Sequence, residues 1–361
     1  MPATPIKRRL IALLRNPRAL SGVSPVEWNA LVPVLRRERL LAHLGAVAKA
    51  ASVFGGLPGT LQDLCESALI RVKHTRRSCL YIAEELTRRL SHQDISVVLL
   101  KGAAYAAADH PFARGRMFSD LDILVRRKDL EKVESVLVQD GWALDPMDVA
   151  DERYYREWMH ELPPFKHPSV AFELDIHHNL TPPVSRIQLD MASFWQNALT
   201  AEKTGLVVLS PPHQLIHSAT HLFFNDELRG GLRELLDIDG LCRMNAGVPD
   251  FWRTAIATAT TQPALTRTLF YALDTAQRLL DTPVDAEALK VLRPPFPSAT
   301  HLNLMRWLFD RSLLEEGAVT TGIAKQWLFI RSHWVRMPPH LLIPHLVRKW
   351  SLKIGQSIKR P

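Results

Sequence analysis

The sequence predicts an α+β protein in which a small mixed α/β core at about residues 91–200 lies between two helical regions. Three observations support this prediction. Apolar residues recur at helical spacing before residue 90, short β-branched and aliphatic runs appear in the core, and helical spacing returns after residue 210. We therefore expect a helical region at 1–90, the core at 91–200, and a helical region at 201–361 with a basic tail.

The N-terminal region carries clear helix signals. Residues 24–27 read Ser-Pro-Val-Glu, a capping box with proline at the first helical position. A second helical stretch covers about 61–90 and is rich in Arg and Lys. We expect these basic residues to form a solvated face, with a polyanion-binding face as the alternative.

The core region alternates strand and helix signals. Aliphatic and β-branched composition predicts buried strands in ISVVLL and DLDILV, and alternation of apolar and polar residues predicts a strand in VAFELDIH. In chain order we expect a strand at 95–100, a helix at 103–110, a loop at 111–119, a strand at 120–125, a helix at 128–141 and a strand at 170–177.

The C-terminal region is again helical in pattern. Ser210-Pro211 is a helix start, and helical segments continue to about residue 335, interrupted by the proline-rich stretch 293–298. The tail 346–361 is basic with scattered Trp and Ile. We expect a plain surface helix there, with peripheral contact to an anionic membrane as the alternative.

The composition is that of an ordinary globular protein. The chain is 47% hydrophobic and 23% charged, which disfavours a disordered chain, a collagen-like fibre or a coiled-coil rod. The formal net charge of +8 suits an anionic partner, which could be a nucleotide, a nucleic acid, a polyanionic glycan or a membrane surface.

Cysteine usage points to a reducing compartment. Cys65, Cys79 and Cys242 lie far apart and form no C-x-x-C, so neither a disulfide framework nor a thiolate zinc site is expected. The N-terminus is basic, but its apolar stretch is broken by Arg15 and no small-residue cleavage site follows it. We therefore interpret it as mature sequence and not as a signal peptide. No run approaches the ~20 apolar residues of a membrane span. We expect a cytoplasmic protein.

Two carboxylates share one face of the strand expected at 120–125. Residues i and i+2 of a strand point to the same side, so Asp120 and Asp122 would lie ~6.6 Å apart along the chain. Leu121 and Ile123 would face the core. Neighbouring carboxylates repel each other unless a cation lies between them, and oxygen ligands of this kind favour Mg²⁺.

The strand expected at 170–177 supplies further titratable groups. Glu173, Asp175 and His177 share one face, and the residues between them are apolar. A third acid from this strand would complete a two-metal site for phosphoryl transfer, in which the ions lie ~3.5–4 Å apart. The alternative is a solvated outer face with two acids and a histidine.

Three short motifs carry a family resemblance: Lys-Gly-Ala-Ala at 101–104, Arg-x-x-Ser-Asp-x-Asp at 116–122, and Asp-x-His at 175–177. A weaker echo lies in His217, His221, Arg233 and Asp237. The arrangement resembles the DNA-polymerase-β-like nucleotidyltransferase superfamily. Within it, the chain is similar to the bacterial nucleotidyltransferase family often linked to exopolysaccharide and capsule gene clusters. The resemblance is specific over about 95–180 and diffuse from about 20 to 270.

The resemblance implies a polymerase-β-like nucleotidyltransferase core, a small mixed sheet with helices, that binds an NTP and two Mg²⁺ or Mn²⁺ ions. It implies that Asp120 and Asp122 are the paired metal ligands and Asp175 the third, with Glu173 as a rival. Asp175 would bind the metal on the nucleophile's side and could also accept the acceptor's proton.

The resemblance also implies a phosphate-binding turn at Lys101, Gly102 and Ala103. The superfamily usually has Gly-Gly or Gly-Ser there, so this chain loses a hydroxyl and gains a cation. Gly102 would let backbone amides approach phosphate and Lys101 would neutralise it, unless Lys101 is an ordinary surface lysine. Arg116 could pair with a phosphate or with the acidic cluster, and Ser119 completes the expected nucleotide-binding set.

Histidines are the remaining candidate ligands. Three of them fall at i, i+4 and i+8 of a predicted helix: His213, His217 and His221. The glutamate of a zincin is replaced by Ser218, which argues against a metalloprotease. We expect His177 and His221 to form hydrogen bonds to the metal ligands or to pack against the core. A zinc site formed by these histidines with Asp237 is the alternative.

No P-loop or Rossmann motif occurs, so those nucleotide sites are not supported, and the absence of G-x-S-x-G argues against an α/β-hydrolase. Three hypotheses remain, and the resemblance implies the first of them. We expect a metal-dependent nucleotidyltransferase that moves NMP from an NTP, such as ATP, to an acceptor and releases pyrophosphate. The acceptor stays open among a sugar, a protein, a small molecule and an RNA end, and a role in polysaccharide biosynthesis rests on the resemblance alone.

Two alternatives are a catalytically inactive nucleotide- or protein-binding relative and a nucleic-acid-binding protein. Stable nucleic-acid binding is disfavoured because the basic residues are spread out and form no RRM or OB motif.

Overall fold

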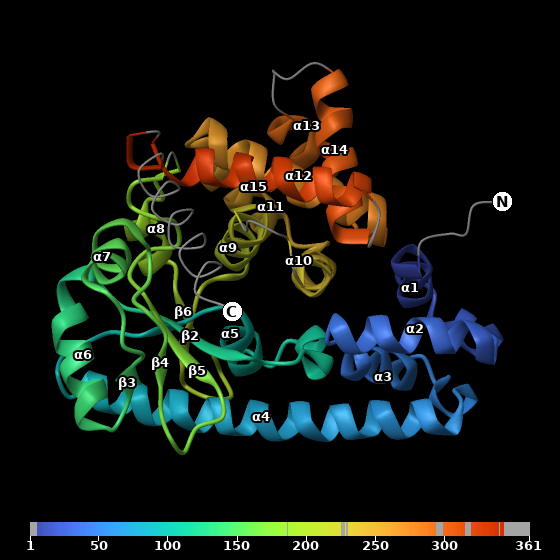
Figure 1. The fold of residues 1–361 in the computed structure, drawn as a ribbon, viewed down its shortest axis with the longest axis horizontal. Coiled ribbons are helices and arrows are strands. Elements are labelled where there is room, and N and C mark those ends of the chain that lie inside the picture. Colours follow the sequence, from blue (N-terminus) through green and yellow to red (C-terminus); the bar gives the residue numbers. More distant parts are fainter. Residues whose placement is uncertain are drawn as a thin grey trace, which may run out of the picture.

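The computed structural model describes residues 6–185, 187–224, 228, 230–293, 299–314, 319–338 and 340–342. The basic tail at 346–361 and residues 294–298 of the proline-rich stretch lie outside the described residues. Within the described part, the architecture is a mixed α+β fold, as the sequence predicts (Figure 1).

The N-terminal region is helical, as expected. Its α-helices are α1 (Ile6–Arg15), α2 (Pro25–Arg37), α3 (Leu41–Ala50) and α4 (Gly59–Ser91). Ser24 caps α2 by accepting a hydrogen bond from the amide of Glu27 at 3.3 Å, which confirms the predicted cap. Helix α4 has 33 residues, so it is about 50 Å long. It runs under both the other N-terminal helices and the sheet (Figure 1).

The sheet has seven strands in the order β3-β4-β5-β2-β1-β7-β6. The strands are β1 (Val98–Leu99), β2 (Asp120–Leu124), β3 (Ala143–Leu144), β4 (Phe165–Lys166), β5 (Glu173–His177), β6 (Leu199–Thr200) and β7 (Val207–Val208). Strand β2 pairs in parallel with β5 and antiparallel with β1, so the sheet is mixed. The strand expected at 120–125 is present, and the strand expected at 170–177 is shorter than predicted, because it begins at Glu173. The two-residue strands other than β1 were not predicted.

The predicted strand at 95–100 is wrong in length, because only Val98–Leu99 pair as a strand. The amide of Leu100 still donates to the carbonyl of Asp122 at 3.0 Å, and the chain then turns at Lys101, which has φ of 43°. Helix α5 (Lys101–Ala107) therefore begins two residues before the predicted helix at 103–110. The expected loop at 111–119 contains a 3₁₀ turn, Pro111–Gly115.

The remaining core helices are short. They are α6 (Leu130–Gln139), α7 (Val149–Arg153) and α8 (Met191–Gln196). The amphipathic helix expected at 128–141 is confirmed by α6, which buries Val133 and Leu137. Gly141 follows it with φ of 87°, the left-handed conformation that suits glycine after a helix.

In the described part of the C-terminal region, seven helices form a layer above the sheet (Figure 1). They are α9 (Pro211–Phe224), α10 (Gly231–Asn245), α11 (Pro249–Thr260), α12 (Pro263–Leu280), α13 (Ala286–Leu292), α14 (Ala299–Leu314) and α15 (Val319–Arg336). Helix α9 packs against α10, α11 and α12. No described helix is both long and apolar enough to cross a membrane.

Two buried clusters connect these layers. One joins the sheet and α6 to the second half of α4, through Cys79, Ala83 and Leu86. The other joins the N-terminal helices to the C-terminal helices. The core was predicted to end at residue 200, but β7 lies beyond that residue and belongs to the same sheet as β6. Residues from all three expected regions therefore share the hydrophobic interior.

Candidate active site

The acidic residues meet because β2 and β5 run side by side in parallel. Their register pairs Asp122 with Asp175 and Asp120 with Glu173. Since alternate residues of a strand share a face, the acids of both strands point to the same side of the sheet. The flanking residues Leu121 and Leu174 are fully buried and fix that orientation.

Asp122 lies at the centre of this arrangement. Its side chain is only 1% exposed, and its Oδ1 accepts hydrogen bonds from Lys101 Nζ at 2.6 Å and His177 Nε2 at 3.0 Å. Although burial opposes ionisation, the Lys101 ammonium and the His177 hydrogen bond hold the pKa of Asp122 well below its usual range. Burial also opposes the charge of Lys101, but Asp122 raises the pKa of that ammonium.

A cavity of about 230 Å³, here called the acidic pocket, opens beside Asp122. Its lining comes from α5, β2, β5, α9 and α10, from the residue after the 3₁₀ turn, and from the segment between α7 and β4: Lys101, Arg116, Asp120, Glu161, Asp175, Ser218, His221, Arg233 and Glu234. The pocket therefore lies between the sheet and the C-terminal helices. Four of these side chains are acidic and three are basic, and no side chain in the set is purely apolar.

Asp175 shows the crowding of negative charge in the acidic pocket. Burial raises the pKa of Asp175 to about 8, and the charges of nearby carboxylates, above all Asp122, add to the effect. A second cation beside Lys101 would relieve this repulsion. The donors are carboxylate oxygens, which suit Mg²⁺ or Mn²⁺, so the residues present fit such a group.

Glu173, the rival third ligand, lies elsewhere. Its side chain is 49% exposed and its Oε1 is 3.6 Å from Lys166 Nζ of β4. It does not line the acidic pocket, whereas Asp175 does. The alternative of a solvated strand face therefore applies to Glu173 but not to Asp175 or His177.

Sequence reasoning missed His160 and Glu161. Glu161 forms an isolated bridge with His177 that brings its Oε2 to 3.4 Å from His177 Nδ1. One ligand atom from each of His160, Glu161 and His177 lies within 4.8 Å of the others. Burial lowers the pKa of His160 to about 3, so its ring is neutral.

This His₂Glu group could also hold a divalent ion. Nδ1 of His160 and Nδ1 of His177 are buried without a hydrogen-bond partner. The hydrogen bond from His177 Nε2 to Asp122 leaves Nδ1 of the same ring as an acceptor, the pattern of a histidine ligand supported by a carboxylate. A single His-Glu dipeptide between a helical turn and a loop gives no sequence signal for such a role.

The residues expected to bind nucleotide lie on both sides of the acidic pocket. Gly102 and Ala103 are buried in the first turn of α5, and a Cβ on Gly102 would lie 2.3 Å from Arg116 Nη1. Arg116 itself pairs with Asp237 of α10, 2.8 Å from Nε to Oδ2, rather than with the acids of the sheet. Ser119 does not line the acidic pocket but faces a neighbouring cavity.

The histidines of α9 have separate partners. His221 lines the acidic pocket and its Nδ1 lies 2.9 Å from Glu234 Oε2. His217 is buried beside His177, and burial lowers its pKa well below the usual value. His213 lies 2.7 Å from Ser210 Oγ at the start of the helix. Because Asp237 is engaged by Arg116, it does not join them in the zinc site considered from the sequence.

The comparisons with known proteins identify a family. Residues 24–281 match the model of a family described as "Uncharacterised nucleotidyltransferase". No curated protein and no solved structure gives a significant match. The matched segment covers more than half of the chain and contains every residue of the acidic pocket. The chain therefore belongs to this family of uncharacterised nucleotidyltransferases.

Proposed function

We propose that this protein is a metal-dependent nucleotidyltransferase that moves NMP from an NTP to an acceptor and releases pyrophosphate. The observation that carries the proposal is the convergence of Asp120, Asp122 and Asp175 on two paired strands. Membership in a nucleotidyltransferase family supports the reaction class. The identity of the NTP, a role in polysaccharide biosynthesis and a cytoplasmic location stay predictions from the sequence.

Asp120, Asp122 and Asp175 are the residues that would hold Mg²⁺ or Mn²⁺. The raised pKa of Asp175 supports this assignment, because burial and the charges of neighbouring carboxylates both disfavour its ionised form, and a bound cation would offset both effects. When bound there, the divalent ion would neutralise phosphate charge and favour the ionised form of an attacking hydroxyl. Lys101 already supplies one positive charge to Asp122, which is consistent with a site built for cations.

The chain's own residues then have distinct roles. The acceptor oxygen forms a bond to the α-phosphorus, and the bond from that phosphorus to the bridging oxygen of the β-phosphate breaks. Asp175 faces the cavity and is the carboxylate to which we assign the acceptor's proton. Lys101, once displaced from Asp122, can donate to a phosphate oxygen.

A catalytically inactive relative that binds a nucleotide or a protein is the second candidate. Asp122 is closed off by Lys101 and His177, and this is the observation in its favour. If Lys101 stays bound to Asp122, the fold is intact but no metal ion can bind to Asp122. An assay of NTP-dependent pyrophosphate release distinguishes the two candidates.

The test incubates purified protein with each α-labelled NTP and Mg²⁺ or Mn²⁺. Pyrophosphate release, self-labelling and transfer into a cell extract are measured. We expect Asp120→Asn and Asp122→Asn to lower NTP-dependent pyrophosphate release by about 10³-fold, because they remove carboxylates that stabilise charge in the transition state.

Glu173→Gln is the matched control, since Glu173 shares the strand face but lies outside the acidic pocket. It should retain activity, and all variants should keep the circular dichroism spectrum of the wild type. No pyrophosphate release with any NTP would favour the inactive relative. Full activity in Asp120→Asn would contradict the assignment of the site.

A further inference from the structure

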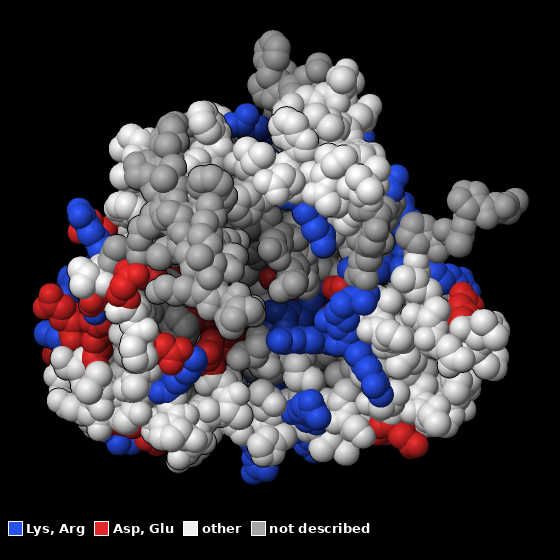
Figure 2. Space-filling view, viewed as in Figure 1, with Lys and Arg blue, Asp and Glu red and all other residues white. Residues whose placement is uncertain are grey.

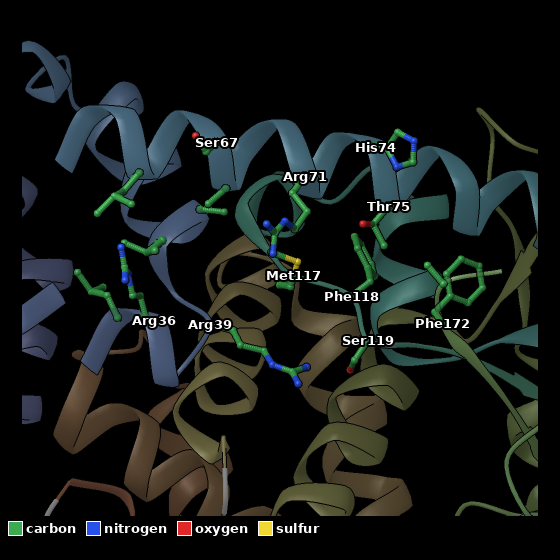
Figure 3. A pocket seen from close by; sticks show the side chains of 16 residues that line it. Arg36, Arg39, Ser67, Arg71, His74, Thr75, Met117, Phe118, Ser119 and Phe172 are labelled. Carbon is green, nitrogen blue, oxygen red and sulfur yellow. The ribbon is translucent and has the colours of Figure 1, made fainter. Parts of the chain in front are cut away.

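A second and larger cavity lies next to the acidic pocket, and we call it the arginine groove. Its volume is about 920 Å³. It is lined by the end of α2, the start of α3, the middle of α4 and the segments that lead into β2 and β5 (Figure 3). The charged and polar members of its lining are Arg36, Arg39, Arg71, His74, Ser67, Thr75 and Ser119.

The lining of the arginine groove is unbalanced in charge. Among the residues that the structure describes, it contains three arginines and a histidine but no aspartate or glutamate. Among the described residues, no ion pair or side-chain hydrogen bond engages Arg36, Arg39 or Arg71. Figure 3 shows Arg71 reaching from α4 toward Met117, with Arg39 on the other side of that residue. Figure 2 shows Lys and Arg gathered at the centre of this face of the molecule.

Two other arginines of α4 have carboxylate partners. Arg76 on the same helix pairs with Asp109 at 2.7 Å, and Arg89 pairs with Asp140. All three arginines are exposed, and they line one cavity in which no described residue supplies a carboxylate, so a bound anion would interact favourably with each of them. Guanidinium groups match the geometry of phosphate oxygens, which they bind through two parallel hydrogen bonds.

The arginine groove adjoins the acidic pocket through consecutive residues. Ser119 lines the groove and Asp120 lines the acidic pocket. Their Cα atoms are therefore about 3.8 Å apart. Phe118 lines the groove and also lies under the phosphate-binding turn, because a Cβ on Gly102 would come within 2.8 Å of its ring. The two cavities therefore lie next to each other at this point of the chain.

We propose that the arginine groove binds the acceptor, and that this acceptor carries a phosphate group. The proposal rests on the proposed function, which supplies the reaction that needs an acceptor. An NTP must bring its phosphates to the carboxylates that would hold the metal, and the groove offers no carboxylate. A phosphate group without a metal ion suits a cavity lined by free arginines.

The apolar part of the lining gives the acceptor a second recognition element. Leu35, Met117, Phe118 and Phe172 border the same cavity as the arginines. The phosphate would bind the guanidinium groups, and a less polar part would pack on these side chains. The attacking hydroxyl would then lie toward Ser119 and Asp120.

The test uses two titrations of the full-length protein by calorimetry. In the first, inorganic phosphate and glycerol 3-phosphate are added in EDTA, without metal or nucleotide. We expect Arg39→Gln with Arg71→Gln to weaken both affinities about tenfold or more, because charge-assisted hydrogen bonds to phosphate are lost. Arg77→Gln is the matched control, since Arg77 is an exposed residue of α4 outside the groove.

In the second titration, a non-hydrolysable NTP analogue is added with Mg²⁺. We expect the double arginine variant to keep wild-type affinity and Asp120→Asn with Asp122→Asn to lose it. If the arginine variant weakens the analogue as much as the phosphate probes, the groove holds the NTP and the proposal is overturned. Absence of binding of both phosphate probes, or equal weakening by Arg77→Gln, also overturns it.

The two titrations separate this proposal from the proposed function. Failure of the analogue to bind, or binding that ignores the aspartate substitutions, would count against the nucleotidyltransferase assignment. The phosphate titration would still report on the arginine groove, because it contains neither metal nor nucleotide.

Discussion

Asp122 shows what a strand pattern can and cannot predict about a single residue. The period of two placed Asp120, Asp122 and Asp175 on one face, and the parallel register of β2 and β5 agrees with this expectation. The pattern could not predict that Lys101 and His177 would close over Asp122. Those contacts depend on the turn at Lys101, which has a positive φ. A positive φ is uncommon in residues other than glycine, so this turn could not be predicted from the sequence.

Gly102 is a residue whose lack of a side chain can be tested. A Cβ there would lie 2.3 Å from Arg116 Nη1 and 2.8 Å from the ring of Phe118. Both neighbours are buried, so neither can move freely. We expect Gly102→Ala to lower the free energy of unfolding by about 1–3 kcal/mol, as overpacking of a dense interior does. Urea unfolding followed by circular dichroism measures the change.

Gly59→Ala is the control for that substitution. Gly59 is the first residue of α4, and a Cβ there would meet nothing within 4 Å. It should leave stability unchanged or raise it slightly, because alanine favours helix. Equal stability of the Gly102 and Gly59 variants would show that the contact with Arg116 is not tight in solution.

At the scale of elements, length decided which parts of the fold could be predicted. The long helices and the five-residue strands β2 and β5 have enough residues to show a period of 3.6 or 2. Strands β3, β4, β6 and β7 have two residues each, and a pair of residues has no period. Their pairing comes from neighbours far away in the sequence, as Leu99 and Val208 show.

The residues of the candidate site could likewise be predicted only where they lie on strands long enough to show a period. Asp120, Asp122 and Asp175 lie on strands with clear alternation, so a sequence could indicate them. His160 and Glu161 lie between a helical turn and a loop, where only the bridge to His177 reveals their place.

Asp109 joins three elements and gives a prediction about pH. It follows α5 and pairs with Arg76 of α4 at 2.7 Å and with Lys203, which lies between β6 and β7. The hydrogen bonds from Lys203 and Arg76 lower the pKa of Asp109 to about 2. Because this value is below that of the unfolded chain, about 3.9, the group stabilises the fold above pH 4. That stabilisation is lost as the pH falls from about 4 to 2.

We expect Asp109→Asn to lower the free energy of unfolding by about 1 kcal/mol at pH 7, a value that allows for solvent screening of the pairs. The difference from the wild type should shrink as the pH falls toward 3, measured by urea unfolding across this range. Asparagine tolerates the backbone of Asp109, which has φ of 51°.

Asp94→Asn is the matched control for Asp109→Asn. Asp94 has a similar backbone, with φ of 58°, is exposed, and has no ion pair among the described residues. Its substitution should change stability little at any pH. A constant difference between Asp109→Asn and the wild type from pH 7 to pH 3 would contradict the ion-pair explanation.

At the scale of the whole molecule, side chains cross the boundaries that composition and periodicity suggest. Tyr105 of α5 lies 2.5 Å from Ser218 of α9 through their hydroxyl oxygens. Arg116, just before β2, pairs with Asp237 of α10. Both contacts are buried and link the sheet region to the C-terminal helices. The acidic pocket is assembled from both, so neither region would form it alone.

The pair of Arg116 and Asp237 therefore tests whether these regions fold together. Arg116→Met leaves Asp237 buried without its partner, and we expect this to lower the free energy of unfolding by about 3–5 kcal/mol. Adding Asp237→Leu removes the unpaired charge, so the double variant should be more stable than Arg116→Met alone.

Urea unfolding of the four proteins of the cycle, followed by tryptophan fluorescence and by circular dichroism, measures the coupling. If the regions are one cooperative unit, both probes shift together in every variant. Additive effects of the two substitutions would contradict the coupling of Arg116 with Asp237. A shift in only one of two separate transitions would show that the sheet and the C-terminal helices fold independently.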